Sequence, residues 1–390
     1  MYLNVCQNRK YRNLLKIDKS ILACVPFCVN FGYNLSILAF GAELKSSICL
    51  LDDGVIYLGK QGGGLIDADN YRQFLQTAAI FQDALGKVPD VVAYDLHPEY
   101  ASSRYALSLG VKSFPVQHHH AHIAACMIEN GITEPVIGIA ADGTGYGTDG
   151  AIWGCEVFHG DLKNLQRAGH LRYFKLFGGD AASIETWRPA AGIMSEIFGT
   201  DFNLNGVDDG TLDIAKSRLT KGAGLARTSS LGRLFDGVSF LLGLCDKNTT
   251  EAQAAISLES AAAKIESAKP LDYNLTQADD GCIELDYRPV IVSLLEKKNK
   301  GIDTDMLARQ FHETIAVMLV ECAEMVSRNT EIKKIMLSGG CFLNKILSLR
   351  VSEMASVKGF DVYMHKITSP GDGCVALGQV GVCANNIMKG

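Results

Sequence analysis

The feature of this sequence that most constrains its fold is a strand–turn–strand pattern that occurs twice, about a hundred residues apart. In each copy an apolar segment enters a turn with glycine or acidic residues and returns as a second apolar segment, as paired strands do. The copies cover 35–51, with Lys45 in its turn, and 136–158, with Asp142 in its turn. The repeat predicts two copies of one domain that face each other across a cleft, although two ordinary hairpins would give the same pattern.

The chain is long enough for two packed domains. It has 390 residues, of which 47% are hydrophobic, and a single core rarely grows to that size. We expect one lobe over 35–134 and a second over 135–390, with a C-terminal helix in the second lobe. Residues 1–34 carry a basic run and show little periodicity, which indicates an N-terminal remnant or a linker.

Hydrophobic periodicity predicts further helices and buried strands. The expected helices cover 71–85, 100–109, 252–267 and 304–329, and the expected strands cover 91–95 and 335–337. The last strand opens into Ser338, Gly339 and Gly340, ahead of a helix that begins near Asn344. A strand, a Gly-Gly turn and a helix N-terminus together favour contact with a phosphate or a nucleotide.

Charge and composition argue against several classes of protein. The net charge is -6, so the chain has no bulk attraction for polyanions, and we expect no binding to nucleic acid. No uninterrupted apolar run reaches the length of about 18 residues that a membrane span needs. The twelve cysteines form no CxxC pair. These observations predict a cytoplasmic protein with no membrane partner and with reduced, mostly buried thiols.

A run of histidines carries the strongest chemical signal. Four of the nine histidines lie among the five residues from His118 to His122. If a helix begins here, His118 and His122 stand at i and i+4 and project to one side, which is the spacing that two imidazoles need to share a metal ion. The alternatives are an exposed polar helix start and a run that resembles a purification tag.

Two imidazoles need further ligands, and acidic residues in turns are the candidates. Asp142 follows the first strand of the second copy, and Asp372 lies in a glycine-flanked loop ahead of the C-terminal helix. Either residue could instead be a helix cap or an ordinary turn residue. Oxygen ligands suit iron, manganese or magnesium better than a closed structural zinc site.

Seven motifs follow one another along the chain in a family-specific order. They are His118 to His122, Asp142 to Gly150, Gly178-Gly179-Asp180, Trp187-Arg188, Gly232-Arg233-Leu234-Phe235-Asp236, Ser338-Gly339-Gly340 and Asp372-Gly373. In this order they resemble the C-terminal transferase region of the hydrogenase-maturation carbamoyltransferase (HypF) family, and the resemblance spans nearly the whole chain. The region is also similar to tRNA threonylcarbamoyl-transfer proteins and to antibiotic carbamoyltransferases. The resemblance implies a duplicated actin-like ATPase and sugar-kinase (RNase H-like) fold, with two lobes around a nucleotide cleft.

The resemblance also implies a chemistry. It implies one divalent metal, usually iron, ligated by His118, His122, Asp142 and Asp372, which would be the catalytic residues. It implies that the cleft holds an ATP-derived carbamoyl-adenylate. In this family the acceptor of the carbamoyl group is the C-terminal cysteine of a hydrogenase-maturation partner protein. The metal would polarise the carbamoyl oxygen or neutralise charge on the adenylate phosphate.

Five residues are candidates for binding the nucleotide. Lys45 would place a positive charge near the phosphate, and Gly339 and Gly340 would let the backbone approach the adenosine. Asn344 would bind the base or ribose, and Asp236 would accept from a ribose hydroxyl or order its loop. A solvated or capping role is the alternative for Lys45, Asn344 and Asp236.

Among the departures of the chain from the family pattern, two bear on activity. The family has arginine where this chain has Ile184, and glycine where it has Ala252. These changes favour one alternative, a catalytically impaired nucleotide-binding scaffold. A separate alternative within the same chemistry is a small-molecule O-carbamoyltransferase. Full-length family members carry acylphosphatase-like, zinc-finger and adenylate-forming domains ahead of the matched region. We therefore expect this chain to use adenylate supplied by a separate domain or protein.

Overall fold

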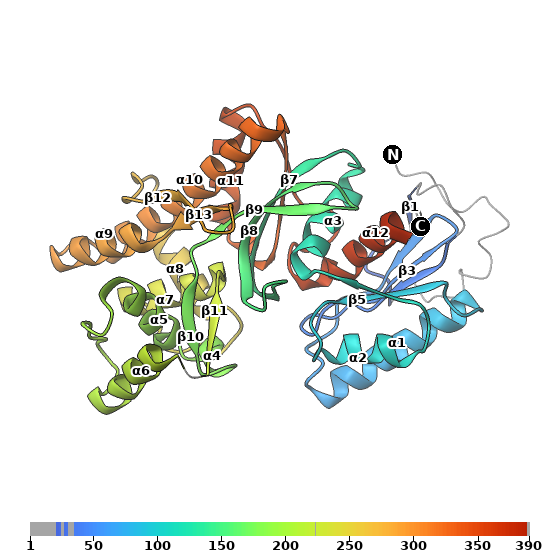
Figure 1. Ribbon diagram of the computed structural model, residues 1–390, viewed down its shortest axis with the longest axis horizontal. Coiled ribbons are helices and arrows are strands. Elements are labelled where there is room, and N and C mark those ends of the chain that lie inside the picture. Colours follow the sequence, from blue (N-terminus) through green and yellow to red (C-terminus); the bar gives the residue numbers. More distant parts are fainter. Residues whose placement is uncertain (1–20, 25–26, 30–34, 223, 388–390) are drawn as a thin grey trace.

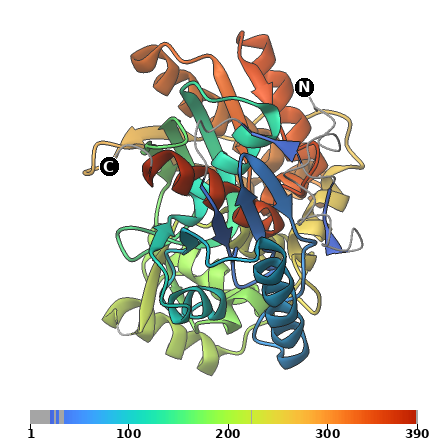
Figure 2. The ribbon, with the colours of Figure 1, turned by 90° about the vertical axis from the view of Figure 1, so that its right-hand side faces the viewer.

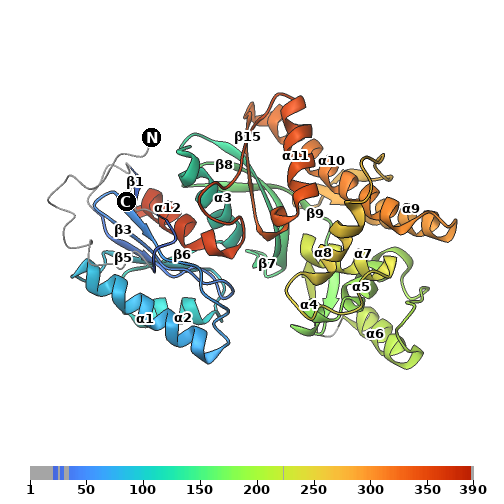
Figure 3. The same ribbon diagram turned by 180° about the vertical axis from the view of Figure 1, so that it is seen from behind.

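The computed structural model describes residues 21–24, 27–29, 35–222 and 224–387. The basic run and most of the expected N-terminal remnant or linker, 1–34, lie outside the described residues. The described chain forms two lobes that lie side by side in Figure 1. Figure 3 shows the same two lobes from behind. Among the described helices, none combines the length and apolarity that crossing a membrane requires.

The first lobe contains a six-stranded sheet with the order β1-β4-β3-β2-β5-β6. Its strands are β1 (Phe27–Cys28), β2 (Ile37–Ala39), β3 (Cys49–Asp52), β4 (Val55–Leu58), β5 (Val91–Asp95) and β6 (Ser113–Val116). Strand β2 is antiparallel to β3 and parallel to β5, while β3 is antiparallel to β4 and β5 is parallel to β6. Figure 2 shows this sheet in front of the second lobe.

The second lobe contains a nine-stranded sheet whose main path is β12-β13-β9-β8-β7-β14-β15, with β10 and β11 paired beside β8. Its strands are β7 (Val136–Tyr146), β8 (Ile152–Gly160), β9 (Leu165–Leu171), β10 (Phe174–Phe177), β11 (Leu225–Thr228), β12 (Asn274–Gln277), β13 (Ile283–Asp286), β14 (Lys334–Ser338) and β15 (Asp361–Tyr363). The order β9-β8-β7-β14-β15 repeats β4-β3-β2-β5-β6 with the same strand directions. The duplicated α/β fold predicted from the sequence is therefore confirmed.

One local expectation was wrong. The segment that begins at Asp142 was expected to be a turn, but β7 continues through it to Tyr146. The pairing with β8 shifts register between Ala141 and Gly145, so this stretch forms an irregular, bulged strand. The chain turns only after Gly147, and Gly150 adopts the positive φ of 75° that the turn requires.

The helices connect and cover the two sheets. They are α1 (Ala68–Leu85), α2 (Ala101–Ser108), α3 (His118–Asn130), α4 (Ala181–Ile184), α5 (Trp187–Phe198), α6 (Asp209–Lys221), α7 (Leu231–Leu242), α8 (Gln253–Ala262), α9 (Arg288–Asn299), α10 (Thr304–Thr330), α11 (Lys345–Val357) and α12 (Val375–Ile387), with the short 3₁₀ helices η5 (Gly340–Leu343) and η6 (Asp372–Cys374). Helices α1, α2, α8 and α10 lie where apolar periodicity predicted helices. Their ends differ from the prediction by a few residues because caps set them, as Asp67 does for α1.

Two helices fill the space between the sheets. Helix α12 packs on β2, β3 and β5, α3 packs on β7 and β14, and the two helices pack on each other (Figures 1 and 3). Helices α1 and α2 cover the opposite face of the first sheet, and α7 and α10 cover that of the second. Both sheets thus share one buried core, which includes Ile37 of the first and Met336 of the second.

The C-terminal helix lies with the first sheet, although the expected second lobe, 135–390, included it. The side-chain amide of Gln379 on α12 accepts from the Gly41 backbone N at 2.9 Å and donates to its carbonyl at 3.1 Å. Helices α12 and α3 approach so closely that a Cβ on Gly378 would lie 1.7 Å from the carbonyl oxygen of Ala121. The chain thus returns from the second sheet to pack on the first. The boundary at residue 134 remains a prediction.

Candidate metal centre

The start of α3 places two imidazoles on one face. Strand β6 ends at Val116, and the Gln117 side chain caps the helix by accepting from the backbone N of His120 at 2.9 Å. Since the helix begins at His118, His118 and His122 stand one turn apart and point to the same side. Both are fully buried. The exposed helix start considered from sequence is therefore excluded.

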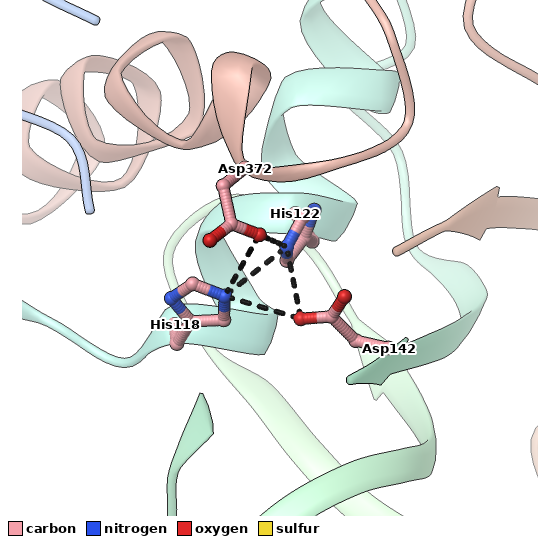
Figure 4. Close-up of side chains that lie close together, drawn as sticks. All are labelled: His118, His122, Asp142 and Asp372. Carbon is pink, nitrogen blue, oxygen red and sulfur yellow. Dashed lines mark hydrogen bonds and ion pairs between the residues drawn. The ribbon is translucent and has the colours of Figure 1, made fainter. Parts of the chain in front are cut away.

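Four side chains from three segments converge here, as Figure 4 shows. The Nε2 atoms of His118 and His122 lie 3.2 Å apart. Oδ2 of Asp142, on β7, lies 3.3 and 3.5 Å from these two nitrogens. Oδ1 of Asp372, on η6, lies 3.8 and 3.7 Å from them. One ligand atom from each residue thus lies within 4.8 Å of the other three.

The hydrogen bonds of the site leave its donor atoms free for a cation. The Nδ1 of His118 lies 2.7 Å from Oδ2 of Asp95, and because an ionised carboxylate only accepts, Nδ1 carries a proton, so that the neutral ring has its lone pair on Nε2. The Nδ1 of His122 faces the Ser338 hydroxyl at 3.3 Å. Oδ2 of Asp142 is buried without a hydrogen-bond partner among the described residues. Two nitrogen lone pairs and carboxylate oxygens directed at one point fit a divalent metal ion.

The charges of the site also favour a cation. Burial alone would lower the pKa of His118, but Asp95, Asp142 and Asp372 outweigh it and raise that pKa well above its ordinary value. Burial would raise the pKa of Asp142, but the two imidazoles lower it well below its ordinary value. The Asp142 carboxylate is therefore ionised, and the imidazole of His118 holds a proton beside it. A metal ion can replace that proton.

The other two histidines of the run play a different part. Burial, and then the neighbouring His118, lowers the pKa of His119 well below its ordinary value, and its Nε2 lies 4.0 Å from Asp142 Oδ2. Burial lowers the pKa of His120 to about 4. Both imidazoles are thus held neutral in the fold.

Three residues outside the predicted ligand set support the two imidazoles. Asp95 contacts His118, while Ser338 and Cys374 contact Nδ1 of His122 at 3.3 and 3.4 Å. The sequence did contain a signal for Asp95. Asp95 ends β5, and His118 follows the end of β6. Because the two strands are parallel neighbours, their ends lie at the same edge of the sheet.

Lys45 lies close to the loop that carries Asp372. A Cβ on Gly371 would be 3.9 Å from the Lys45 Nζ. The same amine pairs with Oε1 of Glu251 at 2.5 Å. The turn between β2 and β3 therefore brings a positive charge beside the candidate metal centre.

The Gly-Gly turn after β14 holds Asp142 in place. Gly339 has a φ of 104°, and a Cβ there would lie 2.2 Å from the Ala141 carbonyl oxygen, so only glycine fits. The backbone N of Gly340 donates to Oδ1 of Asp142 at 2.9 Å. Contact with a nucleotide, the role expected for this turn, remains a prediction.

Asn344 and Asp236 make structural hydrogen bonds. Asn344 caps α11, since its Oδ1 accepts from the Leu347 backbone N at 2.9 Å. Asp236 is buried, with its carboxylate 2.8 Å from the Arg233 guanidinium and 3.2 Å from the Asn248 amide. These contacts correspond to the capping and loop-ordering alternatives. Binding of a nucleotide by either residue remains a prediction.

The two departures that bear on activity, Ile184 and Ala252, lie in different settings. Ala252 has a φ of 56°, a left-handed conformation that favours glycine, and it directly follows Glu251, the partner of Lys45. Ile184 ends α4 and is 43% exposed. The change at Ala252 thus strains the backbone next to a residue that contacts Lys45.

Comparison with known proteins identifies the family. The model of the carbamoyltransferase Kae1-like domain, second subdomain, matches residues 138–379, and that of the HypF Kae1-like domain matches residues 33–129. The chain belongs to the HypF family. Together with the strand order, this membership confirms the expected actin-like fold class.

The relatives of this HypF family chain differ in length. A carbamoyltransferase HypF homolog of Cupriavidus necator is 36% identical, with 89% of this chain and 91% of the relative covered. Carbamoyltransferase HypF of Synechocystis is 32% identical, with 88% of this chain and 46% of the relative covered. A crystal structure of full-length HypF in a phosphate- and nucleotide-bound form has a TM-score of 0.89 and 34% identity, and covers 94% of this chain and 57% of that one. The chain thus spans about half the length of the last two.

Proposed function

We propose that this chain transfers a carbamoyl group from an ATP-derived carbamoyl-adenylate to the C-terminal cysteine of a hydrogenase-maturation partner protein. The observation that carries the proposal is the convergence of His118, His122, Asp142 and Asp372 in a member of the HypF family. A full-length HypF is known in a phosphate- and nucleotide-bound form, and this supports nucleotide binding in the family.

The four residues would hold one divalent metal ion, which we propose to be iron. When bound, such an ion polarises the carbamoyl oxygen or neutralises charge on the adenylate phosphate. The Lys45 amine lies on the Asp372 side of the site, where it would attract the same phosphate. The acceptor thiolate would form a C–S bond to the carbamoyl carbon, and the C–O bond to the phosphate would break, with the electron pair leaving on AMP.

We propose that the adenylate is made by a separate domain or protein. The regions of this chain that match the family are its Kae1-like domains. Incubation of the chain with carbamoyl phosphate, ATP and a peptide that ends in cysteine should give carbamoylated peptide only when an adenylate-forming domain is added. The mass of the peptide reports the transfer. Carbamoylation by the chain alone would show that the first half-reaction also occurs here.

The role of the histidines is tested with metal analysis. The wild-type chain should bind about one metal ion, and the double substitution His118→Ala/His122→Ala should abolish metal binding and transfer. His120→Ala is the matched control, because His120 belongs to the same run but not to the four-residue cluster. Full metal content in the double variant would contradict the assignment.

A second candidate function is favoured by one observation. The left-handed backbone at Ala252 strains the segment that contacts Lys45, which suits a nucleotide-binding scaffold with impaired transfer. Binding of both metal and ATP without carbamoylation of any peptide or small hydroxylated acceptor would support the scaffold. Carbamoylation of a small hydroxylated acceptor alone would support O-carbamoyl transfer.

A further inference from the structure

A buried chain of polar side chains leads away from His122 on the side opposite the candidate metal centre. The Ser338 Oγ lies 3.3 Å from the Nδ1 of His122 and 2.8 Å from the Nε2 of His365. The Nδ1 of His365 lies 3.0 Å from Oε1 of Glu129. The side chains of His365 and Glu129 are 2% and 0% exposed, and Ser338 is fully buried. These side chains are therefore shielded from bulk water.

The chemistry of each group fixes the direction of the hydrogen bonds when His365 is neutral. The Glu129 carboxylate can only accept, so Nδ1 of His365 carries the proton and its Nε2 accepts from the Ser338 hydroxyl. The oxygen of Ser338 is then free to accept from the Nδ1 proton of His122. The Pro370 carbonyl, at 3.5 Å from the hydroxyl, and the Cys374 sulfur, at 3.4 Å from the imidazole, are the weaker alternatives. This direction leaves a lone pair on Nε2 of His122, which faces His118.

Glu129 is built into this position. It lies seven residues after His122, two helical turns along the same face of α3. Its carboxylate also accepts from the backbone N atoms of Lys366, Ile367 and Thr368 at 2.9 to 3.1 Å and from the Thr368 hydroxyl.

These bonds keep the carboxylate ionised and anchor a loop. Burial would raise the pKa of Glu129, but the hydrogen bonds from His365 and from the loop lower it to about 2. The anchored loop leads directly to Asp372 on η6. Glu129 thus contacts the segments that position two of the four proposed ligands, His122 and Asp372.

We propose that Glu129, His365 and Ser338 form a positioning relay that fixes the ring of His122 for metal binding. Asp95 makes the corresponding contact to His118 directly. Each of the two metal-facing imidazoles would then be backed by a carboxylate, one in contact and one through two intervening side chains. Such outer partners orient an imidazole and raise its basicity, and their loss typically weakens metal binding about 10- to 100-fold. The proposal rests on the proposed metal function.

The test measures binding of Co²⁺ to the full chain, by titration and by the visible absorption of the bound ion. Ser338→Ala and Glu129→Gln should each weaken Co²⁺ binding about 10- to 100-fold and change the absorption spectrum. Because both residues act through one relay, the double variant should bind about as weakly as the weaker single variant. Glu129→Gln combined with Asp95→Asn, which acts on the other imidazole, should instead multiply the two losses.

The matched control is Asn130→Ala. The Asn130 amide donates to the Met364 carbonyl at 3.1 Å, so it anchors the same loop without contacting the relay. This variant should bind Co²⁺ like the wild type. If Glu129→Gln fails to fold, Ser338→Ala still tests the relay, because this substitution removes only one hydroxyl. Unchanged Co²⁺ binding in Ser338→Ala would overturn the relay alone, whereas a wild-type chain that binds no Co²⁺ would overturn the metal centre and the relay together.

Discussion

The Nδ1 of His118 lies 2.7 Å from Oδ2 of Asp95, the last residue of β5. This contact fixes the tautomer that turns the Nε2 lone pair toward His122. Asp95→Asn removes the charge but keeps the shape, so we expect metal affinity to fall about 10- to 100-fold with the fold retained. Titration with Co²⁺ and circular dichroism measure the two effects. Asp90→Asn, just before the same strand, should leave affinity unchanged, and an equal loss in both variants would contradict the prediction.

Lys45→Ala should weaken the binding of adenine nucleotides. A charge-assisted contact to a phosphate contributes roughly 1.5 to 3 kcal/mol, so the Kd for ATP should rise about 10- to 100-fold. The thermal shift that ATP produces should shrink accordingly, because a ligand that binds only the native state stabilises it by mass action. Glu251→Gln is the control, since it removes the ion-pair partner of Lys45 but keeps the amine. A thermal shift that is the same in Lys45→Ala and wild type would count against the phosphate contact.

Ala252→Gly should stabilise the chain. A left-handed conformation costs a non-glycine residue roughly 1 to 2 kcal/mol, and the greater freedom of glycine in the unfolded chain offsets part of that gain. We expect the free energy of unfolding to rise by about 0.5 to 1 kcal/mol in urea titrations. The same substitution in a helix interior, Ala316→Gly in α10, should destabilise instead. A lower stability in Ala252→Gly would show that the backbone at this position is not strained.

The contribution of Glu129 to stability should depend on pH. Its folded-state pKa is lowered from 4.5 to about 2, so the stabilisation is fully present above the unfolded value and is lost as pH falls from about 5 toward 2. At pH 7 we expect Glu129→Gln to lower the free energy of unfolding by roughly 2 to 3 kcal/mol. The difference from wild type should narrow as pH falls to about 3.5. Denaturation with a chelator present measures this without a contribution from metal, and a difference that is constant with pH would refute it.

Local patterns predicted much of the fold, because each strand, turn and helix of the repeated unit is formed by a short continuous segment. Two of these patterns depend only on neighbours in sequence, and the structure confirms them. They are the turn of the first copy and the i, i+4 spacing of His118 and His122. Asp142 was misplaced in a turn, because glycine-rich sequence favours a turn unless pairing with β8 overrides it. The contact of Asp95 with His118 depends on the order of β5 and β6 in the sheet, and that of Ser338 with His122 on the packing of α3 against β14. Neither contact can be predicted from local periodicity, because each joins segments that are distant in sequence.

The close contact between α3 and α12 has a consequence for substitutions outside the proposed ligand set. Gly378 has no room for a methyl group against Ala121, one residue before His122. A larger side chain there would push apart the helix that carries the imidazoles and the helix that η6 leads into. A substitution at Gly378, six residues from Asp372 and at a position that holds no ligand, would therefore disturb the proposed metal centre together with the core that both sheets share.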